Sequence, residues 1–332
     1  MLFPPHSMAE LTTVIPVYNG EKFISETLEC LAAQRARPDR VVVLDDSSTD
    51  RTPEIVRNFA TIRCDLIKNE QDRGLFANHN RALRLAPETE YLHILHANDT
   101  VGPEFYSKLL PLLKNASAFA MAYSDHVFIR EDGTPLKQVV ETHAPARRLS
   151  LGGFLKDQSE LKSIQLHSAL MKTGHREIPV QFRLDLPQLG DVVFHSQFAP
   201  LCSEIWSHPD VLSFVRIHQD SATNKNIHKL QAWVLDEWKT MEIVLSLLKE
   251  KGLRTWQQRQ KLKLLFAARC HVKTKSIQAR DPAYARNIRE AVIPITGQLY
   301  WRMAGIVVAL RDTIKKPTNF TTERLNAPKQ PA

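Results

Sequence analysis

Residues 41–52 read Val-Val-Val-Leu-Asp-Asp-Ser-Ser-Thr-Asp-Arg-Thr, an apolar run that ends in two adjacent acids and a group of turn-forming residues. An unbroken run of β-branched and aliphatic residues is typical of a strand that is buried on both faces of a parallel sheet. In an open α/β sheet, ligands bind at the carboxyl ends of such strands. The stretch therefore predicts an α/β fold with a ligand site beside Asp45 and Asp46.

The segments on either side alternate between strand-like and helix-like patterns. Strands are expected over residues 11–15, 40–44, 62–67, 91–95 and 118–129. Helices are expected over residues 21–34, 53–60, 75–85 and 103–113. The first strand should end at Pro16, and Thr52 should cap the helix that begins with Pro53. Repeated βα units with buried strands predict a doubly wound, mainly parallel sheet, followed by a helical C-terminal extension.

The pattern divides the chain into five regions. Residues 1–10 form a tail and residues 11–130 carry the βα units. Residues 131–226 are irregular, with long loops expected around Gly152, Gly153 and several prolines. Residues 227–315 show helical periodicity, and the proline-containing tail 316–332 is expected to be disordered.

The charge of the chain is unevenly distributed. The protein has 332 residues, 43% of them apolar, and a net charge of +8. Residues 229–332 contain 20 Lys and Arg but only 8 Asp and Glu, whereas the preceding part is slightly acidic. Such a basic region is either a solvated helical surface or a site of attraction to anionic lipids or a phosphorylated acceptor. No nucleic-acid-binding motif accompanies the charge, so nucleic acid is not an expected partner.

The cysteines and apolar segments indicate a cytoplasmic protein. The four cysteines are scattered without a Cys-x-x-Cys pair, which argues against a zinc site or a disulfide framework. Residues 1–10 lack the basic and apolar regions of a signal peptide. The best candidate for a membrane span, residues 291–310, contains Pro294, Gln298 and Arg302, which are costly in lipid. We therefore expect at most a peripheral contact with the cytoplasmic face of the membrane.

Three motifs, taken in order and with their spacing, resemble the family 2 glycosyltransferases with the GT-A fold. They are residues 14–19 (Val-Ile-Pro-Val-Tyr-Asn), residues 44–52, and Arg73-Gly74 followed by Ala77 and Asn80. Each motif alone is weak, but the ordered set over residues 11–130 is specific. The resemblance implies that residues 11–130 bind a nucleotide-sugar donor and that residues 131–226 hold the acceptor and the catalytic base.

The resemblance also implies roles in donor binding for individual residues. Pro16 and Tyr18 would lie beside the base, and Asp46 would accept a hydrogen bond from it. A tyrosine ring offers a stacking surface, and a carboxylate at a strand end can accept an imide or amino proton. Tyr18 could instead be a half-buried aromatic residue, and Asp45 a turn or cap residue. Asp50 is expected to close the turn rather than to contact ligand.

The diphosphate of the donor needs positive charge, which this family supplies partly through a divalent cation on an Asp-x-Asp motif. Here the corresponding residues are His96-Ala97-Asn98-Asp99, so one carboxylate remains. We expect Asp99 and Asn98 to hold Mn²⁺ or Mg²⁺, although the altered motif leaves the need for metal open. Arg73, at the start of a predicted helix, would face the phosphates; it could equally be an ordinary surface arginine.

Residues 189–194 (Leu-Gly-Asp-Val-Val-Phe) resemble the family's segment for the catalytic base. Inverting transfer is a direct displacement, so one base suffices to take the proton of the acceptor hydroxyl. We expect Asp191 to be this base, with Asp185 as the competitor. The family often has an Arg shortly after the acid, where this chain has His195 and Ser196. Asp191 could also be an acid that only stabilises a helix N-terminus.

Two further segments bear on function. Residues 215–223 resemble the family's closing segment, in which Arg216 and His218 on a flexible loop would clamp the diphosphate. Residues 298–316 predict a basic amphipathic helix whose apolar positions fall near one face. This helix either packs on its own domain or lies on a membrane surface.

Taken together, the sequence predicts an inverting glycosyltransferase that uses a nucleotide-diphosphate sugar, UDP being favoured only by its frequency in the family. The acceptor would be a hydroxyl of a cell-surface glycan precursor, as a glycan or a lipid-linked molecule. A nucleotide-sugar-binding protein without catalysis remains an alternative because the metal motif is altered. A nucleotidyltransferase is a weaker one, since residues 16–19 are not the Gly-rich phosphate loop that it normally needs.

Overall fold

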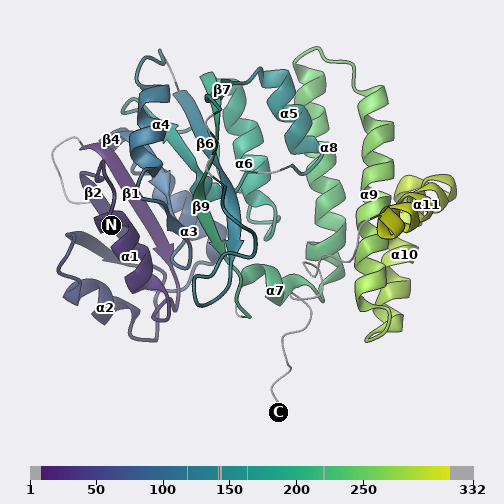
Figure 1. The fold of residues 1–332 in the computed structure, drawn as a ribbon, viewed down its shortest axis with the longest axis horizontal. Coiled ribbons are helices and arrows are strands. Elements are labelled where there is room, and N and C mark those ends of the chain that lie inside the picture. The colour runs from purple at the N-terminus through teal and green to yellow at the C-terminus, as the bar shows by residue number, and fades with distance from the viewer. Residues whose placement is uncertain are drawn as a thin grey trace. The chain divides into compact units, whose positions relative to one another are not determined.

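The computed structural model describes residues 9–314 except 118, 141, 143, 163 and 220, and it leaves out the side chains of residues 222, 223 and 312–314. The chain forms two compact units (Figure 1). The first contains Met1–Phe154 and Ile164–Arg216, and the second contains Leu155–Ser163 and Ile217–Ala332. Residues 11–130 and most of residues 131–226 thus lie in the first unit, and the predicted helical region, residues 227–315, lies in the second.

The first unit is built on one sheet with the strand order β3-β2-β1-β4-β8-β6-β9-β5, and β7 pairs with β9. The strands are β1 (Ala9–Val17), β2 (Arg40–Asp45), β3 (Cys64–Lys68), β4 (Thr89–Ile94), β5 (Thr100–Val101), β6 (Phe119–Ile129), β7 (Arg147–Arg148), β8 (Ala169–Lys172) and β9 (Cys202–Arg216). The α/β class is confirmed. The sheet is mixed, however, because β8 is antiparallel to both β4 and β6, whereas β3, β2, β1 and β4 are parallel.

The predicted end of the first strand at Pro16 is wrong, because β1 continues to Val17. Pro16 pairs with Leu44 of β2, while the pairing of β1 with β4 already ends at Val14. β4 has therefore ended before β1 reaches Pro16, the residue that has no backbone N–H group to donate to a neighbouring strand. The extra two residues bring β1 level with Asp45 at the end of β2. The carboxyl ends of these parallel strands form one edge of the sheet.

The helices of the first unit follow the predicted βα order. They are α1 (Ile24–Ala32), α2 (Thr52–Asn58), α3 (Leu75–Leu83), α4 (Phe105–Leu113) and α6 (Gly190–Phe198), with the short 3-10 helices η1 (Ala86–Glu88), η2 (Leu166–Ser168) and η3 (Ala199–Leu201). Helix α5 (Leu151–Ser159) begins in the first unit and ends in the second. Thr52 is the first residue of α2 rather than its cap. Asp50 accepts hydrogen bonds from Thr52 N and Oγ1, so the acid, as expected, closes this turn.

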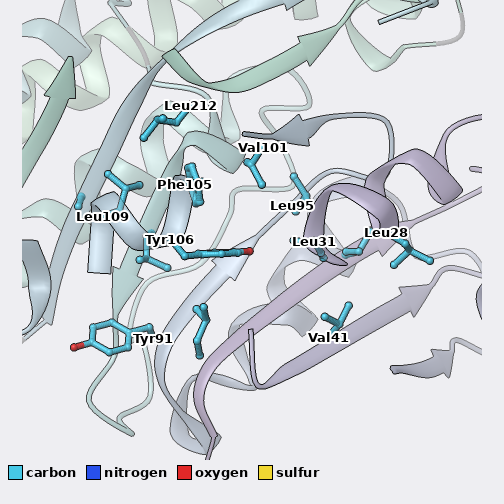
Figure 2. Close-up of a cluster of buried hydrophobic side chains, with 14 of the residues drawn as sticks. Leu28, Leu31, Val41, Tyr91, Leu95, Val101, Phe105, Tyr106, Leu109 and Leu212 are labelled. Atoms are coloured by element: carbon cyan, nitrogen blue, oxygen red, sulfur yellow. The ribbon is translucent and has the colours of Figure 1, made fainter. Parts of the chain in front are cut away.

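One face of the sheet is covered by a large apolar cluster. Figure 2 shows Leu28 and Leu31 of α1 together with Phe105 and Tyr106 of α4 in this cluster. Alternate residues of the strands contribute to it, as expected for side chains that point to opposite faces in turn. Val42 and Leu44 lie between those positions and are equally buried, so the parallel strands are covered on both faces. This double burial explains the continuous apolar run in residues 41–44.

The prediction of an irregular region with long loops over residues 131–226 is wrong in part. This region contains α5, β8, α6, the 15-residue β9 and α7 (Ala222–Asn226). β9 escaped prediction because it includes Pro209 and several ionisable residues, and its pairing with β6 shifts register at three places. A strand with bulges and mixed burial shows no clean alternation of apolar and polar residues.

The second unit is helical, as predicted. Besides α7 and the end of α5, it contains η4 (Gln231–Leu235), α8 (Asp236–Glu250), α9 (Trp256–Ile277), α10 (Pro282–Thr296) and α11 (Gln298–Ile314). Both α10 and α11 pack against α9, and they also contact each other. The segment considered as a membrane span is divided between α10 and α11 by Gly297, which has a φ of 92°. Within the described residues, every helix is too short or too polar to cross a bilayer.

Candidate active site

The loops after β1 and β2 are joined at the carboxyl edge of the sheet. Asn19 N donates to Ser48 Oγ (2.9 Å), and Thr49 N donates to Asn19 Oδ1 (2.9 Å). Asn19 and Ser47 have φ values of 50° and 66°, a region that non-glycine residues seldom occupy. Such strain persists only where the surrounding contacts enforce it. The two loops therefore form one rigid support beside the end of β1.

Asp46 holds this support to the start of α3. Its Oδ2 accepts hydrogen bonds from Arg73 N and Gly74 N, both at 3.0 Å, and its Oδ1 accepts one from Asn69 Nδ2. The carboxylate is buried. Burial raises the pKa of Asp46, although these three donors act in the opposite direction. In this conformation its acceptor capacity is directed to the chain itself, so the base contact predicted for Asp46 stays a prediction.

The other predicted donor-binding residues at this edge differ in exposure. Tyr18 is 51% exposed, so its ring is available as a stacking surface, whereas Pro16 is buried within β1. Arg73 is exposed next to Gly74, which precedes the first residue of α3 and has a φ of 85°. The side chain of Arg73 is thus close to a helix N-terminus and open to solvent, a suitable arrangement for contact with phosphate.

A second cluster lies after β4 and is formed by His96, Asp99 and His167. His96 Nδ1 lies 3.1 Å from Asp99 Oδ2, and His167 Nδ1 lies 3.2 Å from the same oxygen. His167 belongs to η2, which is brought to β4 because β8 pairs with β4. The ligand atoms of the three residues all lie within 4.8 Å of one another. His167 was not predicted, since a single histidine before a short strand carries no sequence signal.

The protonation states in this cluster suit a metal site. Burial alone would raise the pKa of Asp99, but His167, His96 and the N–H of Arg216 reverse the effect, so its pKa is lowered. Burial lowers the pKa of His167 to about 4, which leaves the imidazole neutral at pH 7. Although His167 Nδ1 lies close to Asp99, it makes no hydrogen bond there, and this buried nitrogen is left without a protein donor or acceptor. Two imidazoles and a carboxylate that converge in this way are a plausible donor set for a divalent cation.

Asp99 is also hydrogen-bonded to the last residue of β9. Its Oδ1 accepts a hydrogen bond from Arg216 N (2.7 Å). Arg216 Nε donates to the backbone oxygen of Asn98 (2.9 Å), and its guanidinium also contacts the carbonyl of Glu131 and the carboxylate of Glu26. The ligand role of the Asn98 side chain stays a prediction.

The placement of Arg216 on a flexible loop is therefore wrong. Arg216 is the last residue of β9, its side chain is buried, and its donors are directed to the protein. Its position fits a residue that fixes the loop 96–99 rather than a mobile phosphate clamp. His218 falls in the second unit, where its carbonyl accepts hydrogen bonds from Ser221 N and Asn224 Nδ2.

The candidate base, Asp191, stands at the second position of α6. Its Oδ1 accepts a hydrogen bond from Val192 N (2.8 Å). Burial raises the pKa of Asp191 to about 6, while the charge of His96 acts to lower it. A series of ring contacts leads from α6 through Phe182 and His79 to His96, so Asp191 stands on a helix that packs beside this cluster. The competitor Asp185 is exposed and forms a bidentate ion pair with Arg183 (2.9 and 2.7 Å), which keeps it charged and in contact with solvent.

Close packing of α6 against α3 fixes the position of Asp191. A Cβ atom at Gly190 would lie 2.5 Å from Cε2 of Phe76 in α3. The ring of Phe76 stacks on Phe182, which in turn stacks on Phe194 of α6. His79 of α3 packs edge-on against both Phe182 and His96. Only glycine before Asp191 allows this approach, so the small residue is a structural requirement for the placement of the acid.

Comparison with known proteins identifies the class. The family model described as glycosyl transferase family 2 matches residues 12–178, half of the chain. The protein belongs to this family, as the resemblance of its motifs predicted. Glycosyltransferase GlyA of Streptococcus pneumoniae is 24% identical over 199 residues, which are 59% of this chain and 28% of that protein. The putative teichuronic acid biosynthesis glycosyltransferase TuaG of Bacillus subtilis is 26% identical over 137 residues, 41% of this chain and 53% of that protein.

Solved structures confirm the GT-A type of fold. The structure of S. aureus TarS residues 1–349 in complex with UDP-GlcNAc has a TM-score of 0.56 and 17% identity, covering 88% of this chain and 92% of that one. The mannosyltransferase PcManGT of Pyrobaculum calidifontis in complex with GDP-Man and Mn²⁺ has a TM-score of 0.52 and 18% identity, covering 92% and 88%. The match to this chain covers only part of the length of the curated relatives, 28% of GlyA and 53% of TuaG.

Proposed function

We propose that this protein is an inverting glycosyltransferase that moves a sugar from a nucleotide-diphosphate donor to a hydroxyl group. The observation that carries the proposal is the position of Asp191, a poorly compensated carboxyl group near the cluster at the end of β4. The exposed ring of Tyr18 and the exposed Arg73 offer a surface for the base and positive charge for the diphosphate. Donor and base would thus meet at the carboxyl edge of one sheet.

In this reaction Asp191 takes the proton of the acceptor hydroxyl while the oxygen attacks the anomeric carbon. The bond between that carbon and the nucleoside diphosphate breaks in the same step, and the configuration inverts. A base with a pKa of about 6 is deprotonated at neutral pH and still basic enough to accept the proton. Below pH 6, kcat/KM should therefore fall about tenfold for each pH unit as Asp191 becomes protonated.

A divalent cation fits the cluster of His96, Asp99 and His167, whose buried His167 Nδ1 has no other partner. When bound, the cation would neutralise charge on the diphosphate leaving group. Mg²⁺ is held by oxygen ligands and gives up its waters reluctantly, which fits two imidazoles poorly, and PcManGT, a structure that resembles this fold, contains Mn²⁺, so of these two ions we propose Mn²⁺ as the metal. Thermal unfolding with each ion tests this: Mn²⁺ should raise Tm more than Mg²⁺, and His167→Ala should remove the difference. An equal shift for both ions in the wild type would contradict the assignment.

For the donor we propose a UDP-sugar, and for the acceptor a hydroxyl of a cell-surface glycan precursor. The TarS structure that resembles this fold contains UDP-GlcNAc, and relatives act in teichuronic acid and succinoglycan biosynthesis by their names. We further propose that the enzyme works at the cytoplasmic face of the membrane, on a glycan or lipid-linked acceptor.

A panel of UDP-, GDP- and dTDP-sugars, followed by release of nucleoside diphosphate, tests the proposal. One donor should be consumed in an acceptor-dependent reaction, and NMR of the product should show the inverted anomer. The altered Asp-x-Asp motif, with His96 and Asn98 in place of acids, favours one other function, a nucleotide-sugar-binding protein without catalysis. That protein would bind a donor in calorimetry but release no diphosphate with any acceptor.

A further inference from the structure

The last described helix, α11, has two apolar sides, and among the described residues only one of these sides packs against its own unit. Trp301, Ala304 and Val308 are buried, and α11 contacts α9 and α10. The ring of Trp301 stacks on His271 of α9 with ring centroids 3.8 Å apart. The backbone carbonyl of Trp301 also accepts a hydrogen bond from His271 Nε2. This contact fixes the rotation of α11 about its axis and determines which residues point outward.

The outward side carries a row of large aliphatic side chains, here called the α11 stripe. Its members and their exposed fractions are Leu299 (67%), Met303 (42%), Ile306 (62%), Val307 (48%) and Leu310 (57%). Their spacing of four, three, one and three residues places them within about 100° of the helix circumference. Single exposed apolar residues are ordinary on a protein surface, but a contiguous row of them marks an interaction site.

Positive charge borders the α11 stripe on both sides. At 100° per residue, Arg302 lies about 40° beyond one border and Arg311 about 40° beyond the other. Both arginines are exposed, and residues 298–311 contain no Asp or Glu. The sequence continues with Asp312, Lys315 and Lys316, and residues 229–332 have an excess of 12 basic over acidic residues. An apolar row between cationic borders is the pattern of a helix that lies in the interface of an anionic membrane.

We propose that α11 binds the surface of an anionic lipid bilayer, with the α11 stripe inserted at the boundary between headgroups and acyl chains. A second copy of the chain fits less well. Two copies related by a two-fold axis would place arginine borders opposite arginine borders, whether their helices ran parallel or antiparallel. The stripe also lacks the Tyr, Trp and Arg anchors that dominate protein interfaces. The binding is independent of the proposed transfer reaction.

Vesicle flotation with the full-length protein tests this surface. The protein should float with vesicles that contain phosphatidylglycerol and should remain at the bottom with pure phosphatidylcholine. Leu299→Glu places a charge in the stripe without touching the buried side of α11, and it should reduce binding at least tenfold. Arg302→Gln should reduce binding to anionic vesicles about fivefold, corresponding to one lost basic residue. High salt should weaken the binding of the wild type.

Leu253→Glu is the matched control, because Leu253 is also exposed in the second unit (44%) but lies outside α11. It should bind like the wild type. Circular dichroism and Tm of all variants must match the wild type, which excludes loss of binding through unfolding. Absence of binding to anionic vesicles, or equal loss in Leu253→Glu and Leu299→Glu, would overturn the proposal. So would a wild-type dimer in sedimentation that Leu299→Glu dissociates, because the stripe would then be an interface between copies.

Discussion

Two carboxyl groups with little solvent exposure, one in each unit, have opposite surroundings: Glu237 is buried and Asp191 is half-buried. Glu237 of α8 binds Arg269 through both oxygens (3.1 and 2.8 Å), and Lys273 Nζ lies 2.9 Å from one of them. Burial would raise the pKa of Glu237, but Lys273 and Arg269 lower it to about 2. For Asp191 of α6, burial raises the pKa to about 6, and the weaker effects of the Val192 N–H group and of the charge of His96 do not reverse this. A fully paired acid is fixed in its charged form, whereas a poorly compensated one remains able to exchange a proton near neutral pH.

The largest expected effect is on the rate of transfer. Asp191→Asn keeps the size of the side chain but removes the base, so kcat should fall about 10³-fold while the donor Kd changes little. Release of nucleoside diphosphate and calorimetric titration of the donor measure the two quantities. Asp185→Asn is the control, since this exposed acid is paired with Arg183 and should keep most of the activity. Full turnover in Asp191→Asn would remove Asp191 from the mechanism.

Glu237, the paired acid, should instead affect the free energy of unfolding. Glu237→Gln leaves Arg269 and Lys273 partly buried without their counter-charge, so unfolding free energy should fall by roughly 3–5 kcal/mol. Urea unfolding followed by circular dichroism measures the change. Glu242→Gln on the same helix breaks a surface pair with Arg259 and should cost less than about 1 kcal/mol. Similar losses for both variants would show that the triad is not specially stabilising.

The third prediction concerns pH, and the sign for Asp191 is opposite to that for Glu237. The pKa of Asp191 is raised in the folded state, so its protonated form stabilises the fold below its ordinary pKa of 3.8, and this contribution is lost as pH rises through about 6. Asp191→Asn should therefore be more stable than the wild type at pH 7.5, by roughly 2–3 kcal/mol. Tm measured from pH 4.5 to 7.5 should show the two proteins diverging as pH rises. Parallel curves would mean that Asp191 is not strained by burial.

For Glu237 the folded pKa is lowered, so its contribution is present above the ordinary pKa of 4.5 and is lost as pH falls towards 2. Wild type and Glu237→Gln should accordingly converge in stability below pH 4. The contribution of Asp191 changes between pH 3.8 and about 6 and that of Glu237 between pH 4.5 and about 2, so one titration series can follow both.

The sequence predicted the parallel half of the fold well, because its strands are buried on both faces and leave continuous apolar runs. Residues 41–44 and 91–95 needed no tertiary information. β9 could not be found in this way, since Pro209 and register shifts interrupt its pattern. Arg216 was consequently assigned to a loop although it ends a strand. The exposed side of α11 was visible as a periodicity, but only Trp301, packed on His271, shows which side faces outward.

The site was predictable where one motif carries the chemistry and not where distant segments meet. Asp99 and Asp191 were each predicted from their own local motif, and the structure leaves both as candidates. His167 joins Asp99 only because β8 pairs with β4, and no feature near residue 167 signals this contact. The exposure of Tyr18 likewise depends on the rigid loops beside it. A local sequence pattern does not show which strands pair, and it therefore does not show which distant residues meet.

The smallest expected effect tests how Asp191 is held in place. Gly190→Ala puts a methyl group against the Phe76 ring, which cannot easily move because it stacks on Phe182 (centroids 5.4 Å apart). Overpacking of this kind should cost about 1–3 kcal/mol in unfolding free energy, and the displaced α6 should also lower kcat. Gly153→Ala is the control: this exposed glycine lies in α5, and a Cβ there would meet only Ser150 Oγ, at 3.0 Å, a single hydroxyl rather than a stacked ring. It should be neutral or slightly stabilising.

A second substitution decides whether the clash itself is responsible. Phe76→Leu removes the ring atoms that the new methyl group meets, so Gly190→Ala combined with Phe76→Leu should lose less stability than the sum of the single changes. If kcat recovers together with stability, the packing of α3 on α6 positions the base. If stability recovers but kcat does not, the aromatic ring of Phe76 itself is needed to position Asp191. In the wild type this ring packs against Phe182 and His79, and His79 contacts His96, so Phe76→Leu would remove the contacts that order these side chains. Additive losses would show that Gly190 acts independently of Phe76.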